Sequence, residues 1–181
     1  MSIKQELHPL PPSLAAFMDK STVAFTVADA LLPDFPLVHA NPSFTKLTEF
    51  SKEAVVGHNC RFLQPEGGGG PVRAQIRKFL DTDAVKDGRF VIPNVTASGR
   101  PFLNLLYMSK IERAGKCIYI LGSQFDISSR DKEAAERYDE ALTKDLSGMR
   151  VATGETGHVL TGTFSALASS AAIIARAKLE E

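Results

Sequence analysis

The chain has 181 residues, and its 21 basic and 21 acidic side chains give a formal net charge of zero. This balance argues against nucleic acid and anionic membranes as partners, because both attract basic surfaces. No apolar run approaches the roughly 20 residues that a membrane-spanning helix needs. Two cysteines, and no signal-peptide pattern in the first residues, predict a protein of the reducing cytoplasm.

Composition divides the chain into three expected parts. Residues 1–20 are expected to form an N-terminal helical cap, with a helix near residues 13–20. Residues 21–126 are rich in β-branched residues, proline and glycine, and are expected to form the core. The alanine-rich residues 127–181 are expected to form a helical extension. At this length, one domain with an appendage is favoured over two full domains.

Within the core, the expected order is two strands, three short helices and three further strands. The strands are indicated by β-branched runs between turn residues, and the helices by N-cap residues before periodic apolar side chains. The expected strands are residues 22–28, 36–40, 89–95, 101–111 and 116–125, and the expected helices begin near Asn41, Ser51 and Pro71. Pro93 cannot donate a ladder hydrogen bond, so its strand is expected at a sheet edge. The expected fold class is α+β, with short helices covering one face of a five-stranded antiparallel sheet.

The tail carries two helical patterns, separated by Gly154 and Gly157. The first spaces its apolar side chains by three, four and seven, at Ala135, Tyr138, Leu142 and Met149. The second has a heptad-like spacing, at Leu160, Phe164, Leu167, Ala171 and Ile174. Two interpretations stay open: both helices cap the sheet, or the second pairs with another chain. We expect a homodimer through the terminal helices and the outer sheet face, since both surfaces need burial.

One short motif is far more specific than the rest of the chain. Residues 57–64 read Gly-His-Asn-Cys-Arg-Phe-Leu-Gln. They resemble the GxNCRFLQ signature of LOV domains, the blue-light-sensing flavoprotein branch of the PAS family. The resemblance extends from about Ser21 to Asp126. It implies a PAS/LOV fold for the core and, with the helical extensions, a short LOV photoreceptor.

Cys60 is the candidate reactive residue. On residue type alone, a lone cysteine is more often an inert packed side chain, although its polar neighbours Asn59 and Arg61 favour chemical access. The resemblance implies the functional interpretation, because the matching cysteine of LOV domains lies against a bound flavin. There, blue light leads to a reversible bond between the cysteine sulfur and a flavin ring carbon.

The resemblance implies a flavin cofactor, and two arginines favour FMN, with riboflavin and FAD left open. Arg61 and Arg77 match the phosphate-binding positions of the family, and a guanidinium group binds phosphate through paired hydrogen bonds. Strand alternation places amides and apolar side chains on shared faces, as a flat heterocycle with a polar edge requires. The other implied contacts are Thr26, Asn59, Gln64, Asn94, Asn104, Leu106, Met108 and Gln124.

Two departures from the LOV pattern bear on these expectations. Many LOV domains carry a surface ion pair at the positions of Ala54 and Ala97, so that pair is absent here. Thr26 occupies a position near the thiol that is often aliphatic, and its hydroxyl is expected to affect the lifetime of the sulfur–flavin bond.

Gln124 is expected to transmit the light response, because the last strand runs directly into the tail. The expected output is a change in association between copies of the chain. We expect no enzymatic role, since no substrate-handling constellation accompanies Cys60. The alternative functions are a flavin-binding PAS redox sensor and a structural PAS interaction module.

Overall fold

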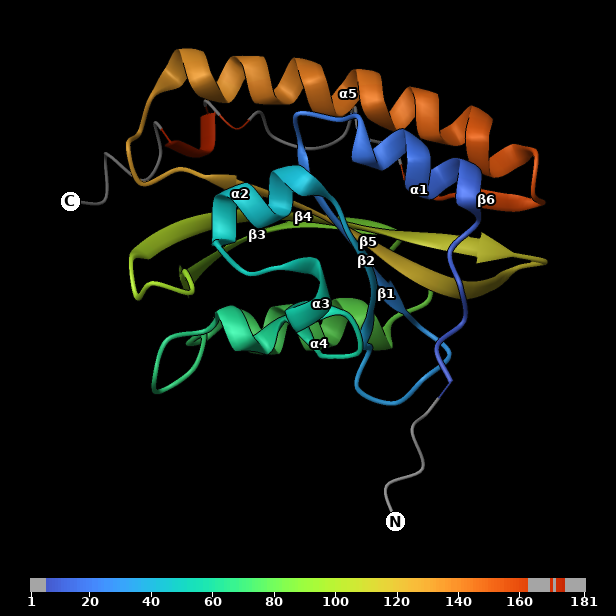
Figure 1. Cartoon of the computed structure of the whole chain (residues 1–181), viewed down its shortest axis with the longest axis horizontal. Coiled ribbons are helices and arrows are strands. Elements are labelled where there is room, and N and C mark those ends of the chain that lie inside the picture. Colours follow the sequence, from blue (N-terminus) through green and yellow to red (C-terminus); the bar gives the residue numbers. More distant parts are fainter. Residues whose placement is uncertain (1–5, 163–169, 171, 175–181) are drawn as a thin grey trace.

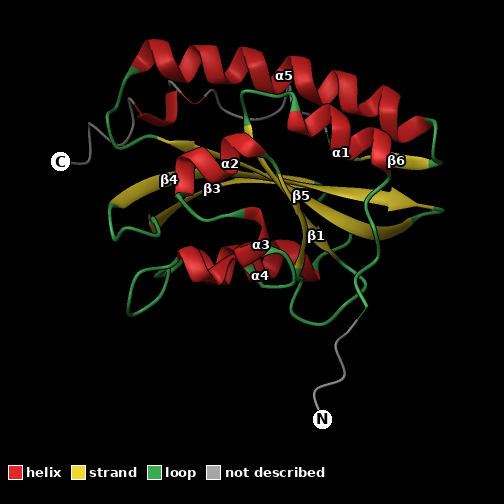
Figure 2. Cartoon of the chain, in the orientation of Figure 1, coloured by secondary structure: helices red, strands yellow, loops and turns green. Residues whose placement is uncertain are grey.

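The structure is a computed structural model that describes residues 6–162, 170 and 172–174. A central antiparallel sheet separates two groups of helices, with α1 (Pro12–Asp19) and α5 (Lys132–Gly154) on one face (Figure 1). The short helix α3 (Lys52–Val55) and α4 (Val72–Asp81) lie on the other face, as the colouring by secondary structure makes clear (Figure 2). This is the α+β PAS arrangement that the sequence predicts.

Five of the strands follow the expected order in the chain and are close to the expected bounds. They are β1 (Ala24–Asp29), β2 (Leu37–Ala40), β3 (Asp87–Val95), β4 (Pro101–Arg113) and β5 (Lys116–Asp126). In space they are ordered β2-β1-β5-β4-β3, so β5 is central and β3 lies at an edge. The edge position confirms the prediction from Pro93, which is opposite Leu103 in the β3–β4 register.

The outer face of the sheet is covered by helices of the same chain. Helix α5 buries Ala135, Tyr138, Leu142, Leu146 and Met149. Most of these side chains join Leu14 and Met18 of α1 and the outward residues of the central strands in one apolar cluster. The first tail pattern therefore forms a helix that caps the sheet, which is one of the two interpretations left open by the sequence.

The inner face carries a second cluster, built from α2 (Pro42–Thr48), α3 and the 3-10 helix η1 (Cys60–Leu63). Its buried members are Ala24, Leu37, Ala40, Phe44, Val55 and Leu63. Asn41 caps α2 by accepting from the Phe44 amide at 3.0 Å, and it also donates to the Met18 and Val23 carbonyls at 2.8 Å. One buried amide thus connects α1, β1 and α2.

The second tail pattern is partly wrong as a helix prediction. Leu160 lies in a short strand, β6 (His158–Leu160), where it pairs with Ile111 at the end of β4. Phe164, Leu167 and Ala171 lie outside the described residues. Ile174 lies in a helical stretch and is buried against Leu105, Ile127 and Ala135. Within the described part of the chain, no helix has the length and apolar character to cross a membrane.

Candidate functional site

The cavity that gathers most of the predicted site residues, which we call the main cavity, lies between the inner face of the sheet and the helices opposite it. Its walls come from β1, β3, β4 and β5 on one side, and from η1 and α4 on the other. All but one of the residues predicted for the site line this cavity, namely Thr26, Asn59, Cys60, Arg61, Gln64, Asn94, Asn104, Leu106, Met108 and Gln124. Thr26 and Gln124, which are 98 residues apart in the sequence, therefore line the same cavity.

Arg77 is the exception, since it lines a neighbouring cavity. Arg61 and Gln64 line both cavities, so the two spaces adjoin. Arg73, one turn before Arg77 on α4, also lines the second space. The second cavity thus has three guanidinium groups around it, a composition suited to an anionic group at the end of a ligand.

Asp34 is a site residue that sequence reasoning missed. It forms an ion pair with Arg61, whose Nη1 donates to its Oδ1 at 2.9 Å, and its backbone carbonyl accepts from Asn59 Nδ2 at 2.6 Å. Asp34 and Phe35 both have positive φ, at 69° and 48°, in the loop between β1 and β2. No local pattern predicts this pairing, because Asp34 and Arg61 are 27 residues apart.

Cys60 begins η1, where the Asn59 side chain caps the turn by accepting from the Arg61 amide at 2.9 Å. The thiol is free and partly buried among the cavity residues. Burial raises the pKa of the Cys60 thiol to about 12, while a hydrogen bond with Thr26 acts in the opposite direction. The sulfur therefore keeps its proton at neutral pH, and it is a source of hydrogen rather than a standing thiolate nucleophile.

Gln124 and Thr26 are joined by a hydrogen bond, in which Gln124 Nε2 donates to Thr26 Oγ1 at 3.1 Å. Both residues are almost fully buried. Within the described part of the chain, Gln124 Oε1 is buried without a hydrogen-bond partner. A buried amide oxygen without a partner is costly in a dry site, so this cavity suits a ligand that carries a donor there.

Asn94 and Asn104 lie side by side on the floor of the cavity. Asn104 Nδ2 donates to Asn94 Oδ1 at 2.9 Å, and Asn94 Nδ2 donates to the Pro93 carbonyl at 2.8 Å. The two amides satisfy each other here, and both are almost fully buried. Both side chains face the same cavity because side chains alternate along strands, as the sequence predicts.

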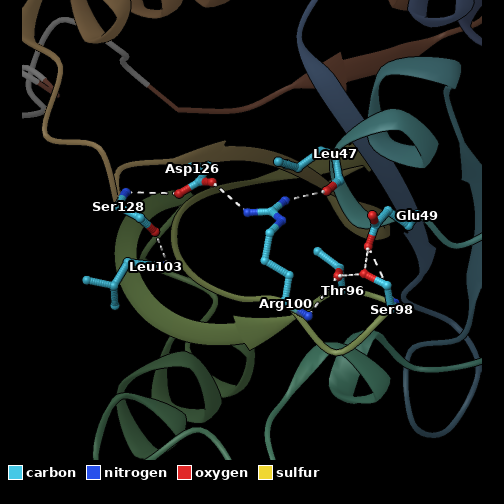
Figure 3. A network of polar contacts seen from close by, with 8 residues as sticks. All are labelled: Leu47, Glu49, Thr96, Ser98, Arg100, Leu103, Asp126 and Ser128. Carbon is cyan, nitrogen blue, oxygen red and sulfur yellow. Dashed lines mark hydrogen bonds and ion pairs between the residues drawn. The ribbon is translucent and has the colours of Figure 1, made fainter.

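A separate polar network joins the edge of the sheet to the end of β5 (Figure 3). Arg100 points between Asp126, whose Oδ2 accepts from Nη1 at 3.4 Å, and the Leu47 carbonyl, which accepts from Nη2 at 3.5 Å (Figure 3). Nearby, Ser98 donates to Glu49 Oε2 at 2.6 Å. The network connects α2 to the β3–β4 turn and to the end of β5.

Several apolar cavity residues were also not named as site residues from sequence. Ile76 and Leu80 of α4, Leu37 of β2 and Phe35 of the preceding loop all line the main cavity. The four-residue spacing of Ile76 and Leu80 marks a helix face, but it does not say what that face covers. In the described residues, no group of three or more metal-ligating side chains is suited to hold a metal ion.

Comparison with known proteins places this fold and site in a family. A family model described as PAS domain matches residues 23–129. The rice protein Phototropin-1A is 34% identical over 133 residues, which cover 72% of this chain and 14% of that protein. A blue-light-activated histidine kinase of Rhizobium johnstonii is 34% identical over 161 residues, covering 79% of this chain and 45% of the kinase. The chain thus spans less than half the length of these two relatives.

Solved structures match over a much larger share of their own length. The structure of the RsLOV d2 variant is 34% identical, covers 93% of this chain and 96% of that one, and gives a TM-score of 0.77. The Rhodobacter sphaeroides LOV protein is 35% identical, with coverage of 75% and 78% and a TM-score of 0.69. The chain belongs to the PAS family. Within that family it is a LOV protein, and its homologues are LOV blue-light photoreceptor domains.

Proposed function

We propose that the chain is a blue-light photoreceptor that binds a flavin in its main cavity and reacts with it through Cys60. The observation that supports this most directly is the shared cavity of Cys60 and Gln124. It brings together a thiol that keeps its proton and a buried side-chain amide, which can donate to or accept from the edge of a ring. A photochemical thiol needs that proton, because the sulfur gives up hydrogen as it bonds to carbon.

A bound flavin supplies the absorption of blue light, a ring carbon that accepts sulfur and a neighbouring ring nitrogen that accepts hydrogen. Cys60 would supply both the hydrogen that such a ring nitrogen accepts, as its S–H bond breaks, and the sulfur that bonds to the ring carbon. Reversal would restore the thiol, so no substrate would be consumed. We therefore propose a receptor and not an enzyme.

FMN is the proposed flavin among the three candidates. The cavity around Arg61, Arg73 and Arg77 adjoins the ring cavity, and it is suited to a terminal phosphate. In the structure the Asp34 carboxylate forms an ion pair with the Arg61 guanidinium. A phosphate that binds Arg61 must therefore displace the Asp34 carboxylate or share the Arg61 guanidinium with it. The arginines thus favour flavins that carry a phosphate over riboflavin, which has none to place there.

The proposed output passes from Gln124 through β5 to α5 and the dimer state. Gln124 faces the main cavity, and Asp126 two residues later ends β5 just before α5 begins. The outer face of the sheet is already covered by α1 and α5. We therefore propose a homodimer formed chiefly by the outer surfaces of these helices and the rest of the tail, with light altering its association.

The experiment that tests this function is an absorption spectrum of the purified protein in the dark, after blue light and during recovery. We expect flavin bands that bleach reversibly, with the response abolished in Cys60→Ala. Cys117→Ser is the matched control, since the Cys117 thiol lies outside the cavity and should leave bleaching intact. A bound flavin that never bleaches would favour a redox sensor. Protein that binds no flavin after reconstitution would favour an interaction module.

A further inference from the structure

The turn that carries Cys60 is attached to the segment where the β1–β2 loop meets β2. The Leu37 amide donates to the His58 carbonyl at 2.9 Å, and the Gly57 amide donates to the Leu37 carbonyl at 2.8 Å. These two backbone hydrogen bonds end just before Cys60. The position of Cys60 itself therefore depends on contacts made further along the turn.

Asp34 makes those contacts, one on each side of Cys60. Its backbone carbonyl accepts from Asn59 Nδ2 at 2.6 Å. Its carboxylate forms an ion pair with Arg61, whose Nη1 donates to Oδ1 at 2.9 Å. Asn59 Oδ1 in turn accepts from the Arg61 amide at 2.9 Å, which caps the turn. The two chain neighbours of Cys60 are thus both bound to Asp34 and to each other.

The backbone around Asp34 has an unusual conformation. Asp34 and Phe35 are both left-handed, with φ of 69° and 48°. Aspartate adopts this conformation more readily than most residues, whereas a phenylalanine does so rarely. Such a pair persists where surrounding contacts stabilise it, and residues of this kind concentrate at functional sites. The contacts with Asn59 and Arg61 are the ones that hold Asp34 in place here.

We propose that Asp34 is a positioning residue that fixes the Cys60 thiol against the main cavity by holding Asn59 and Arg61. All three residues of the turn line the main cavity, whereas Asp34 lines the neighbouring one. Asp34 thus acts on the thiol through the residues beside it. A sulfur must lie close to the ring carbon that it attacks, so a small displacement of the turn would greatly slow the reaction. This proposal rests on the proposed function, because it assigns a role in the same photochemical site.

The geometry of the ion pair allows Arg61 to bind a phosphate at the same time. Both Nη1 and Nη2 of Arg61 donate to Asp34 Oδ1, so the carboxylate binds the end of the guanidinium group. The Nε side of the same group is a second edge that can bind a phosphate. A phosphate on that edge would share Arg61 with Asp34. The turn would then stay attached to Asp34 while the ligand is bound.

The first test measures how often the turn opens, in flavin-free Cys117→Ser protein, where Cys60 is the one thiol. Alkylation by iodoacetamide at fixed pH requires the thiol to become exposed, so its rate reports local opening. Asp34→Ala should raise the rate about three- to tenfold, and Asp34→Asn, which keeps an acceptor oxygen and tolerates the left-handed backbone, by less. Glu53→Ala, which removes an exposed carboxylate from α3, should stay within about twofold of the parent. Equal rates in the parent and both Asp34 variants, or the same rise in Glu53→Ala, would overturn the proposal.

The second test separates reaction from binding in flavin-loaded protein. Asp34→Ala should lower the yield of bleaching per absorbed photon by at least about threefold, because the sulfur is less often in place. The affinity for riboflavin should remain nearly unchanged, since Asp34 does not line the main cavity. Asp34→Asn should recover part of the yield. An unchanged yield, or an equal loss of yield and riboflavin affinity, would overturn the positioning role.

These tests separate the role of Asp34 from the photoreceptor function. Bleaching of flavin-loaded parent protein reports the proposed function alone, whereas alkylation is measured without flavin. A parent that bleaches, with alkylation and yield independent of Asp34, would overturn the positioning role and retain the photoreceptor. A parent that never bleaches, with alkylation that depends on Asp34, would overturn the photoreceptor and retain the hold of Asp34 on the turn.

Discussion

The hydroxyl of Tyr138 on α5 lies 2.5 Å from the hydroxyl of Ser123 on β5, in the buried outer face of the sheet. The Tyr138 ring also stacks on Phe125, with ring centroids 4.5 Å apart. Ser123 and Phe125 are the chain neighbours of Gln124, and they point to the opposite face. Tyr138 therefore contacts the two residues that flank the proposed transmitter.

Removing the Tyr138 hydroxyl should show how much the hydrogen bond with Ser123 contributes to stability apart from the ring stacking. Tyr138→Phe retains the stacking but leaves the Ser123 hydroxyl buried without its partner, so it should lower the free energy of unfolding by about 1–3 kcal/mol. Ser123→Ala in the same protein should restore most of that loss. Chemical denaturation of the two single variants and the double variant measures this. Strict additivity would show that the two hydroxyls do not interact.

The reactivity of Cys60 should follow its raised pKa. With a pKa of about 12, its alkylation rate should rise roughly tenfold per pH unit from pH 7 to 10 without levelling off. The measurement uses flavin-free Cys117→Ser protein. Cys117, whose pKa burial raises to about 11, should react faster in the matching Cys60→Ala protein. A plateau near pH 9 would mean that Cys60 is an ordinary exposed thiol.

The two arginines should discriminate among flavins. Arg61→Gln and Arg77→Gln should each weaken FMN binding by roughly 10- to 100-fold, the range of one charge-assisted hydrogen bond, and leave riboflavin binding nearly unchanged. Lys78→Gln is the matched control, because this exposed neighbour on α4 lines neither of the two cavities around Arg61. Titration of flavin-free protein measures the affinities. Equal losses for FMN and riboflavin would exclude a phosphate role.

Arg100 should restrain the end of β5 more than it stabilises the fold. Its pair with Asp126 is partly exposed, so Arg100→Gln should lower the free energy of unfolding by no more than about 1 kcal/mol. Ile127 and Ser128 should nevertheless exchange their amide hydrogens faster, because their segment loses contacts with α2 and the β3–β4 turn. Hydrogen exchange by mass spectrometry tests this. Lys116→Gln, at the opposite end of β5, should leave that segment unchanged.

His39 should make stability fall in mild acid. Burial, and secondly the charge of Lys52, lower the pKa of His39, while the hydrogen bond with Asp19 opposes them. The unfolded chain therefore binds a proton more readily, and the stabilisation present above about pH 6.5 is lost as pH falls through the lowered folded pKa. Denaturation at pH 8 and pH 5 measures this. His39→Gln should flatten the dependence, and a second contribution of the same sign is expected from His158.

The sheet and most cavity residues are predictable from sequence because they depend on local periodicity. Asn94, Asn104 and Gln124 face one space because side chains alternate along strands, and β5 carries Ser123 outward for the same reason. The motif around Cys60 adds the family, and with it the pairing of strands that local patterns leave open. Where both kinds of information apply, the predicted residues line one cavity in the structure, except Arg77, which lines the neighbouring one.

Contacts between distant segments are not predictable in this way. The ion pair of Asp34 with Arg61 depends on two left-handed backbone residues in a loop, and neither is a glycine. Leu160 fits a heptad spacing as well as it fits a strand, and a strand of three residues is too short to show an alternation of its own. Its pairing with Ile111 uses the edge of β4 that β3 leaves open beyond Ser109, which no local pattern in the tail reveals.

The central place of β5 sets a rule for fusing this chain to other proteins. Successive residues of β5 face alternately the cavity and α5, so inserting or deleting one residue between Lys116 and Gln124 would exchange their sides. Gln124 would then point at Tyr138, and Ser123 would enter the cavity. Insertions beyond Asp126 leave this parity intact. Fusions that replace α5 should therefore retain the chain unaltered through Asp126 and vary only the residues that follow.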